Sequence, residues 1–241
     1  MTLNTKKIKP AGGGNNSDMV EPTLAVGGYP ARVIRVYDLG LQPRPAFRGQ
    51  EKSPANHIRI TYELLDAFML DKDGNELENK PIWIDEKMPL FSLEVENAKS
   101  TKRYYAIDPD ENLGGDFSQL IDQPCIVNVV NNPDRKDPKK IYNNVGSVSA
   151  MREREKANAP QLVNDAFVVS LDSDDVDAFN SIPKWIQDEM KESLNWEETE
   201  MYKALQGEAP KKPEPKEEKK PDPAPQDDDV EDEDDDGDIP F

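Results

Sequence analysis

Hydrophobic and polar positions along the first two thirds of the chain follow the period of β-strands. Residues 58–64 show it most clearly, because Ile58, Ile60, Tyr62 and Leu64 alternate with polar or charged neighbours. Five segments of this kind predict strands, and a sixth strand is expected over residues 166–171. The five are residues 31–37, 58–64, 81–84, 126–130 and 140–148.

Helical patterns follow and interrupt these strands. Residues 98–106 and 117–121 predict helices between the third and fourth strands. Near the end of this region, Ser181 is placed to cap a helix that carries Pro183 in its first turn. The apolar residues expected on one face of that helix are Ile186, Met190, Leu194, Met201 and Leu205.

Short strands with added helices predict an α+β protein that is mostly β. Five strands suit a small closed barrel, and five is the number that an OB-fold uses. The pattern alone does not separate an OB-fold from another small barrel. We therefore expect an OB-fold-like five-stranded barrel over residues 21–206, with a helical appendage at its C-terminal end.

Composition changes sharply at both ends of this domain. Residues 1–20 form a Gly-rich arm with Lys6, Lys7 and Lys9, which has nothing to bury and is expected to be disordered. Residues 207–226 are rich in Pro, Lys and Glu, and repeated proline prevents both helix and sheet, so this segment reads as an extended linker. Residues 227–241 form an acidic tail, also expected to be disordered.

Charge and cysteine content narrow the classes of function. The formal net charge is −19, but residues 27–149 hold 16 basic and 19 acidic side chains, whereas the last 35 residues hold 5 and 15. The β-rich region is therefore nearly balanced and remains compatible with an anionic ligand. The single Cys125 excludes an internal disulfide and a cysteine-cluster metal site. No apolar run approaches the length of a membrane span, which predicts a soluble, cytoplasmic protein. No metal or cofactor is expected, because the chain has no phosphate-binding Gly-Lys-Ser/Thr loop and His57 is its only histidine.

The end of the sequence combines strong acidity with an apolar tip. Residues 227–241 carry ten carboxylates and no Lys or Arg, and they close on Asp-Asp-Asp-Gly-Asp-Ile-Pro-Phe. This ending resembles the acidic tip of bacterial and phage single-stranded DNA-binding proteins. The Lys/Glu/Pro linker and the extra helices are closer to the tailed-phage proteins than to the bacterial housekeeping ones, and the order of elements in the middle of the chain also looks like the phage group.

The resemblance implies two roles for this chain. The domain would bind single-stranded DNA during replication, recombination and repair, and the tip would recruit proteins of those processes. Carboxylates would steer the tip to basic partners, and the terminal ring would fill a pocket on them. The tip residues implied in this recruitment are Asp234, Asp235, Asp236, Asp238, Ile239, Pro240 and Phe241. Self-association stays open.

Cations next to aromatic residues mark three candidate DNA-binding clusters in the domain. Non-specific single-strand binding combines a cationic groove for phosphates with aromatic faces for bases. The first cluster follows the first strand, the second lies on the predicted helix 98–106, and the third lies in the turn between the last two strands of the barrel. Trp83 and Arg59 are added because each points away from the predicted core on its strand. The cluster residues are Arg44, Phe47, Arg48, Lys52, then Lys102, Arg103, Tyr104, Tyr105, and then Arg135, Lys136, Lys139, Lys140, Tyr142.

Other interpretations remain open at this point. The aromatic residues of these clusters can instead be ordinary core residues. Asp66 with Asp85, Glu86 and Lys87 loosely resembles the carboxylates and lysine of a Mg²⁺-dependent nuclease. An adaptor that presents the tip without binding DNA would explain the tail. An acidic DNA mimic would explain the net charge, although it would not explain the basic clusters.

Overall fold

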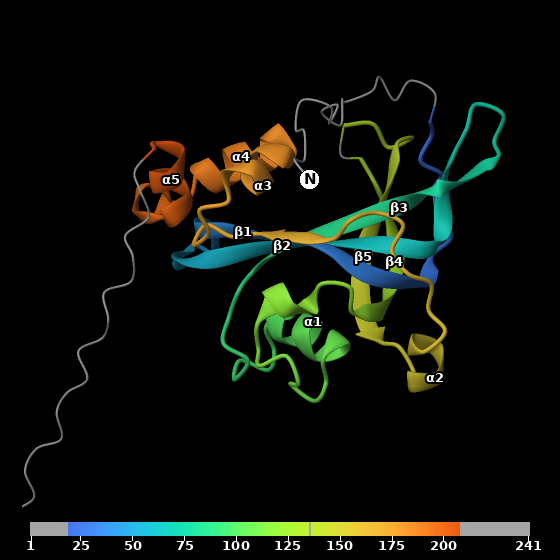
Figure 1. Cartoon of the computed structure of the whole chain (residues 1–241), viewed down its shortest axis with the longest axis horizontal. Helices are drawn as coiled ribbons and strands as arrows, with labels where there is room; N and C mark the ends of the chain where they lie inside the picture. The colour runs from blue at the N-terminus through green and yellow to red at the C-terminus, as the bar shows by residue number, and fades with distance from the viewer. Residues whose placement is uncertain (1–18, 135, 208–241) are drawn as a thin grey trace, which may run out of the picture. The chain divides into compact units, whose positions relative to one another are not determined.

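A six-stranded, mostly antiparallel sheet organises the residues that this computed structural model describes, 19–134 and 136–207 (Figure 1). Its neighbours run in the order β3-β2-β1-β4-β5, and β6 pairs with β1 in the parallel direction. All the predicted strands are present, and most are longer than the pattern indicated. Their bounds are β1 Gly27–Phe47, β2 Gln50–Leu70, β3 Glu76–Pro89, β4 Pro124–Pro133, β5 Ile141–Ala150 and β6 Phe167–Val169.

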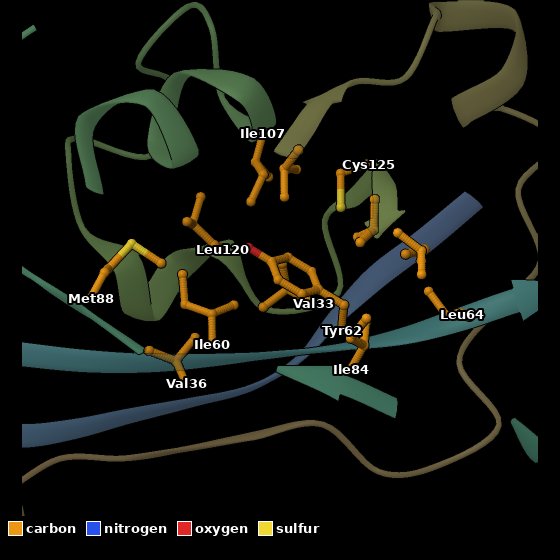
Figure 2. Close-up of a cluster of buried hydrophobic side chains, with 14 of the residues drawn as sticks. Val33, Val36, Ile60, Tyr62, Leu64, Ile84, Met88, Ile107, Leu120 and Cys125 are labelled. Carbon is orange, nitrogen blue, oxygen red and sulfur yellow. The ribbon is translucent and has the colours of Figure 1, made fainter. Parts of the chain in front are cut away.

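The inner face of the sheet carries the main hydrophobic core, and the alternation predicted for β2 is confirmed. Tyr62 is fully buried at the centre of this core, with Ile60 and Leu64 on the same face of its strand (Figure 2). Figure 2 also shows Cys125 of β4 and Ile107 of a helix in this core. Since successive side chains of a strand point to opposite faces, residues 59, 61 and 63 lie on the outer face.

Strand β1 supplies side chains to two cores on opposite faces of the sheet. Val33 and Val36 belong to the main core, whereas Tyr37 and Leu39 belong to a second core under the C-terminal helices. Because both faces of this part of the strand are covered, all of residues 31–37 are buried, including the charged Arg32 and Arg35. Gly40 ends this stretch with a φ of +69°, and a Cβ there would lie 2.7 Å from the Leu171 side chain.

The helices lie on both faces of the sheet. In Figure 1, α1 is on one face, whereas α3, α4 and α5 are on the other. The helices expected over residues 98–106 and 117–121 are present as α1 and as a 3₁₀ turn, η2. The bounds are α1 Lys99–Ile107, η2 Phe117–Leu120, α2 Glu153–Lys156, α3 Val176–Ser181, α4 Lys184–Lys191, η3 Trp196–Glu198 and α5 Glu200–Leu205.

The single long C-terminal helix predicted to begin at Ser181 is wrong. Ser181 is the last residue of α3, Pro183 is the N-cap of α4, and α4 ends at Lys191. The break follows from pairing with the sheet, because Leu194 donates its backbone N–H to the Leu41 carbonyl at 2.8 Å. Leu194 was expected on the buried face of that helix, yet it is exposed.

The closed barrel expected from the strand count is also absent. Closure would require β3 to pair with β5, and the sheet order ends at these two strands without a ladder between them in the part of the chain that is described. The Arg103 side chain of α1 bridges this gap. It binds Glu86 of β3 with two hydrogen bonds of 2.6 and 3.1 Å, and the Gly146 carbonyl of β5 at 3.2 Å.

Candidate nucleic-acid interface

The turn between β4 and β5 exposes the lysines predicted to bind DNA. Lys136, Lys139 and Lys140 are exposed, and Lys140 Nζ lies 4.7 Å from the centre of the exposed Tyr142 ring. The carboxylate of Asp134 is engaged by the turn itself, because it accepts the backbone N–H groups of residues 136 and 137. The predicted Arg135 lies outside the described residues. The turn therefore combines three exposed cations with one exposed ring.

The first predicted cluster belongs to a hairpin and not to a long loop. Strand β1 continues to Phe47 and β2 begins at Gln50, so only Arg48 and Gly49 form the turn. Arg48 and Lys52 are exposed near the tip. Arg44 lies with its guanidinium 5.3 Å from the centre of the Phe91 ring, which covers part of its charge. The side chain of the predicted Phe47 is outside the described set.

Helix α1 does not present the interface that was predicted on it. Tyr104 is fully buried, and its hydroxyl donates to Asp108 Oδ2 at 2.9 Å, so its proposed role in base stacking is wrong. Arg103 is also buried and is bound to Glu86 and Gly146, which removes it from a surface interface. Lys102 is exposed, and Tyr105 is half-buried. The neighbours Arg103 and Tyr104 therefore belong to the core.

The outer face of the sheet forms a cleft with α4 and the chain segment before β6. We call it the outer-face cleft, and its volume is about 650 Å³. Trp83 of β3 and Trp185 of α4 line it, and they are 42% and 55% exposed. Exposed indole rings beside cations are the elements of a base-stacking site. The other aromatic and cationic residues that line the cleft are Tyr37, Phe167, Arg35 and Arg59.

The Trp83 ring is held by the residues around it. Its Nε1 donates to Glu63 Oε2 at 2.9 Å, and the Arg35 guanidinium lies 5.0 Å from its centre. The same guanidinium lies 3.9 Å from the centre of the Phe167 ring. Burial lowers the pKa of Arg35, but an arginine remains protonated at neutral pH. The Trp83 ring is thus held in place by contacts within the protein, and a ring that is already ordered loses little entropy when a ligand binds to it.

Ion pairs cross the rim of the outer-face cleft. Arg59 of β2 pairs with Asp85 of β3 and, at 3.2 Å, with Glu189 of α4. Glu189 also binds Lys87 Nζ at 2.5 Å. Burial alone would raise the pKa of Glu189, but the hydrogen bond from Lys87 and the charges of Lys87 and Arg59 outweigh it and lower the pKa. The predicted Arg59 is therefore in the cleft, and it is paired with carboxylates there.

Trp185, Phe167 and Arg35 were not among the predicted binding residues. In the sequence, Trp185 lies in an acidic segment directly before the apolar Ile186. The spacing of Ile186 and Met190 could have indicated that Trp185 is exposed. They are four residues apart and define the buried face of α4, and Trp185 lies off that face. Arg35 had no such signal, because its partner Phe167 is 132 positions away in the sequence.

The carboxylates proposed for a nuclease do not converge. Alternation along β3 places Glu86 on the buried inner face, whereas Asp85 and Lys87 lie on the outer face. Within residues 19–134 and 136–207, no group of His, Cys, Asp and Glu is placed to hold a metal ion. No helix of that same part is long and apolar enough to cross a membrane. The tip residues, 234–241, lie outside the described residues.

Comparison with known proteins does not assign the chain to a family. No protein family, curated protein or solved structure matches the chain.

Proposed function

We propose that this protein binds single-stranded DNA without sequence preference, and the outer-face cleft carries the proposal. Two exposed tryptophans from different elements line one cleft, and each has an arginine against its ring. Stacking tolerates any base because every base has a π face, while cations take the phosphates whatever the sequence. The cleft therefore suits a single strand, whose bases are not already stacked inside a duplex.

The arrangement of strands supports an OB-like, partly open barrel as the scaffold. In an OB-fold, strands 2 and 3 and the loops between strands 1 and 2 and between strands 4 and 5 contact the ligand. Arg59 is on β2, Trp83 is on β3, Arg48 is in the β1–β2 turn, and Lys136 precedes β5 in the β4–β5 turn. The cations and the ring of the proposed interface thus come from the regions that such a fold uses for binding.

The acidic segment 227–241 supplies the second part of the proposal. We assign it the recruitment of replication, recombination and repair proteins in the cytoplasm of a bacterial host, on the basis of its resemblance to the tips of phage single-stranded DNA-binding proteins. Phe241 would enter a pocket on the partner, and the carboxylates would speed the encounter with a basic surface. This part of the proposal rests on the sequence alone.

Fluorescence polarisation with a labelled single-stranded oligonucleotide at two salt concentrations tests DNA binding. We expect binding that weakens with salt, and a matched duplex that competes poorly. Replacing Trp83 by Ala should lose about 1–3 kcal/mol of affinity without changing the salt slope. Replacing Lys136, Lys139 and Lys140 by Ala should weaken binding and flatten the slope by about 0.7 for each lost phosphate contact.

Two controls make this experiment decisive. A thermal melt of the Trp83→Ala variant checks that the loss is not unfolding, since Glu63 keeps the donors Val163 N and Asn164 Nδ2 when the indole is removed. Trp196, which stacks on Phe179 at 5.9 Å, gives a matched tryptophan that does not line the cleft. Absence of oligonucleotide binding by the unmodified protein would refute the proposal and favour an adaptor or a DNA mimic.

A further inference from the structure

Glu189 of α4 joins two cations that lie side by side on the sheet. Its Oε1 is 2.5 Å from Lys87 Nζ, and its Oε2 is 3.2 Å from Arg59 Nη2. The Glu189 side chain is only 20% exposed, so this is not a loose surface pair. Each oxygen of the Glu189 carboxylate thus pairs with one of the two cations.

A neighbouring anion stabilises the pair formed by Arg59 and Lys87. Arg59 and Lys87 are direct cross-strand partners of β2 and β3, and like charges in that position repel each other. Asp85 binds another nitrogen of Arg59 but lies on β3 itself, beside Lys87 in the same strand. A group with two or more oxygens and a negative charge relieves the repulsion when it sits between both cations. A carboxylate does so, and a phosphate diester has the same two oxygens and the same charge.

The surroundings of this cation pair match a nucleotide. Trp185 is four residues before Glu189 on α4, and the Arg59 guanidinium lies 4.6 Å from its ring centre. Residues four apart lie on the same side of a helix, so an exposed ring and the resident carboxylate are neighbours. Arg59 also has unused capacity, because its buried Nε has no hydrogen-bond partner within the described chain. A shift of the side chain after Glu189 leaves would allow that donor to be satisfied.

We infer that Glu189 occupies a phosphate subsite formed by Arg59 and Lys87, and that a phosphate of the bound single strand displaces it. This inference rests on the proposed function. In the free protein the carboxylate neutralises the subsite and prevents the two cations from repelling each other. On binding, the phosphate takes its place, and the base next to that phosphate reaches the Trp185 ring.

Displacement has a measurable effect on affinity and on salt dependence. Glu189 competes with the phosphate, so its removal should tighten binding. When a phosphate displaces the Glu189 carboxylate, that carboxylate attracts a cation from solution. This uptake cancels part of the cation release that accompanies DNA binding. Without that carboxylate, the decrease of log affinity with log salt should be steeper by up to about one unit.

The experiment compares Glu189→Gln with the unmodified protein in oligonucleotide titrations over a range of salt. We expect about three- to tenfold tighter binding at low salt, the size that two partly exposed ion pairs allow. Glu192→Gln is the matched control, because Glu192 is exposed at the C-cap of the same helix and the substitution changes the net charge equally. Glu189→Asp is the second variant, since it keeps the charge and shortens the side chain so that it cannot span both cations.

The outcomes separate the inference from the proposed function. Tighter binding by Glu189→Gln and Glu189→Asp, with little change for Glu192→Gln, supports a resident carboxylate. Equal effects of the two glutamine variants would reduce the result to overall charge and overturn the inference. Unchanged or weaker binding by both Glu189 variants, with native melting curves, would also overturn it, while DNA binding itself would stand. If the unmodified protein binds no oligonucleotide, the proposed function fails as well.

Discussion

Replacing Arg103 by Met removes the cation that neutralises a carboxylate inside the main core. Glu86 is buried, and Arg103 gives it two hydrogen bonds, at 2.6 and 3.1 Å. Methionine keeps an unbranched apolar stem in the same space, so the change acts mainly on charge and hydrogen bonding. It also removes the bond to Gly146 of β5, which is the bridge between the two ends of the strand order.

The expected loss of stability follows from what remains around Glu86. Breaking one side of a buried ion pair costs about 3–5 kcal/mol, because the other charge is left buried. Lys99 Nζ stays 2.7 Å from Glu86 Oε2, but its side chain is 43% exposed, so it compensates only in part. The Tyr62 hydroxyl continues to donate to Glu86 at 3.0 Å. We therefore expect a loss of about 3 kcal/mol, which lowers the melting temperature by about 6–12 °C in a domain of this size.

Thermal melts beside oligonucleotide titrations test this prediction. Arg103→Met should melt early, and the protein that is still folded should bind DNA with native affinity, since the guanidinium is in the core. Adding Glu86→Gln should restore part of the stability, because the uncompensated charge is gone. A variant that melts like the native protein and yet binds DNA more weakly would refute this reasoning and return Arg103 to the DNA interface.

Three further predictions concern other parts of the molecule. Burial raises the pKa of Asp38, so the folded state holds its proton to a higher pH, and stability should fall as pH rises from about 3.8 through the raised pKa. Asp38→Asn should lose this decline in melts at a series of pH values, and an unchanged profile would count against it. Burial raises the pKa of Cys125 to about 12, so a thiol reagent should label it only at the rate of unfolding; rapid labelling of the native protein would show otherwise. Deleting residues 227–241 should tighten oligonucleotide binding at low salt, because their tethered carboxylates compete with phosphate; equal or weaker binding would exclude that competition.

Much of the sheet was predictable because its signals are local. The alternation around Ile60 and Tyr62 identified the buried face of β2, since side chains of a strand point to opposite faces by geometry alone. The same rule correctly placed Trp83 on the exposed face of β3. Helix α1 was also found from its pattern. The cationic turn between β4 and β5 followed from its position between two recognisable strands.

Errors arose where a distant segment determines the environment of a residue. The Lys-Arg-Tyr-Tyr stretch has the composition of a DNA-binding surface. Arg103 is nevertheless buried, because it pairs with the buried Glu86 of β3. The C-terminal helical pattern is continuous, yet the Leu194 backbone N–H donates to the Leu41 carbonyl of β1, and this contact interrupts the helix. The closed barrel was expected from the number of strands, and that number does not say whether β3 and β5 meet.

The sequence by itself determined which segments form strands, the inner and outer faces of β2 and β3, and the separation of a nearly balanced β-rich region from an acidic end. These properties depend on neighbours a few residues apart and on composition. Only the tertiary structure decided that Trp83 and Trp185 share a cleft, and that Glu189 stands between Arg59 and Lys87. Those contacts join segments about a hundred residues apart, and the packing of α4 against the outer face of the sheet creates them. The pattern of hydrophobic and polar residues within a short segment does not indicate how α4 packs against a distant sheet.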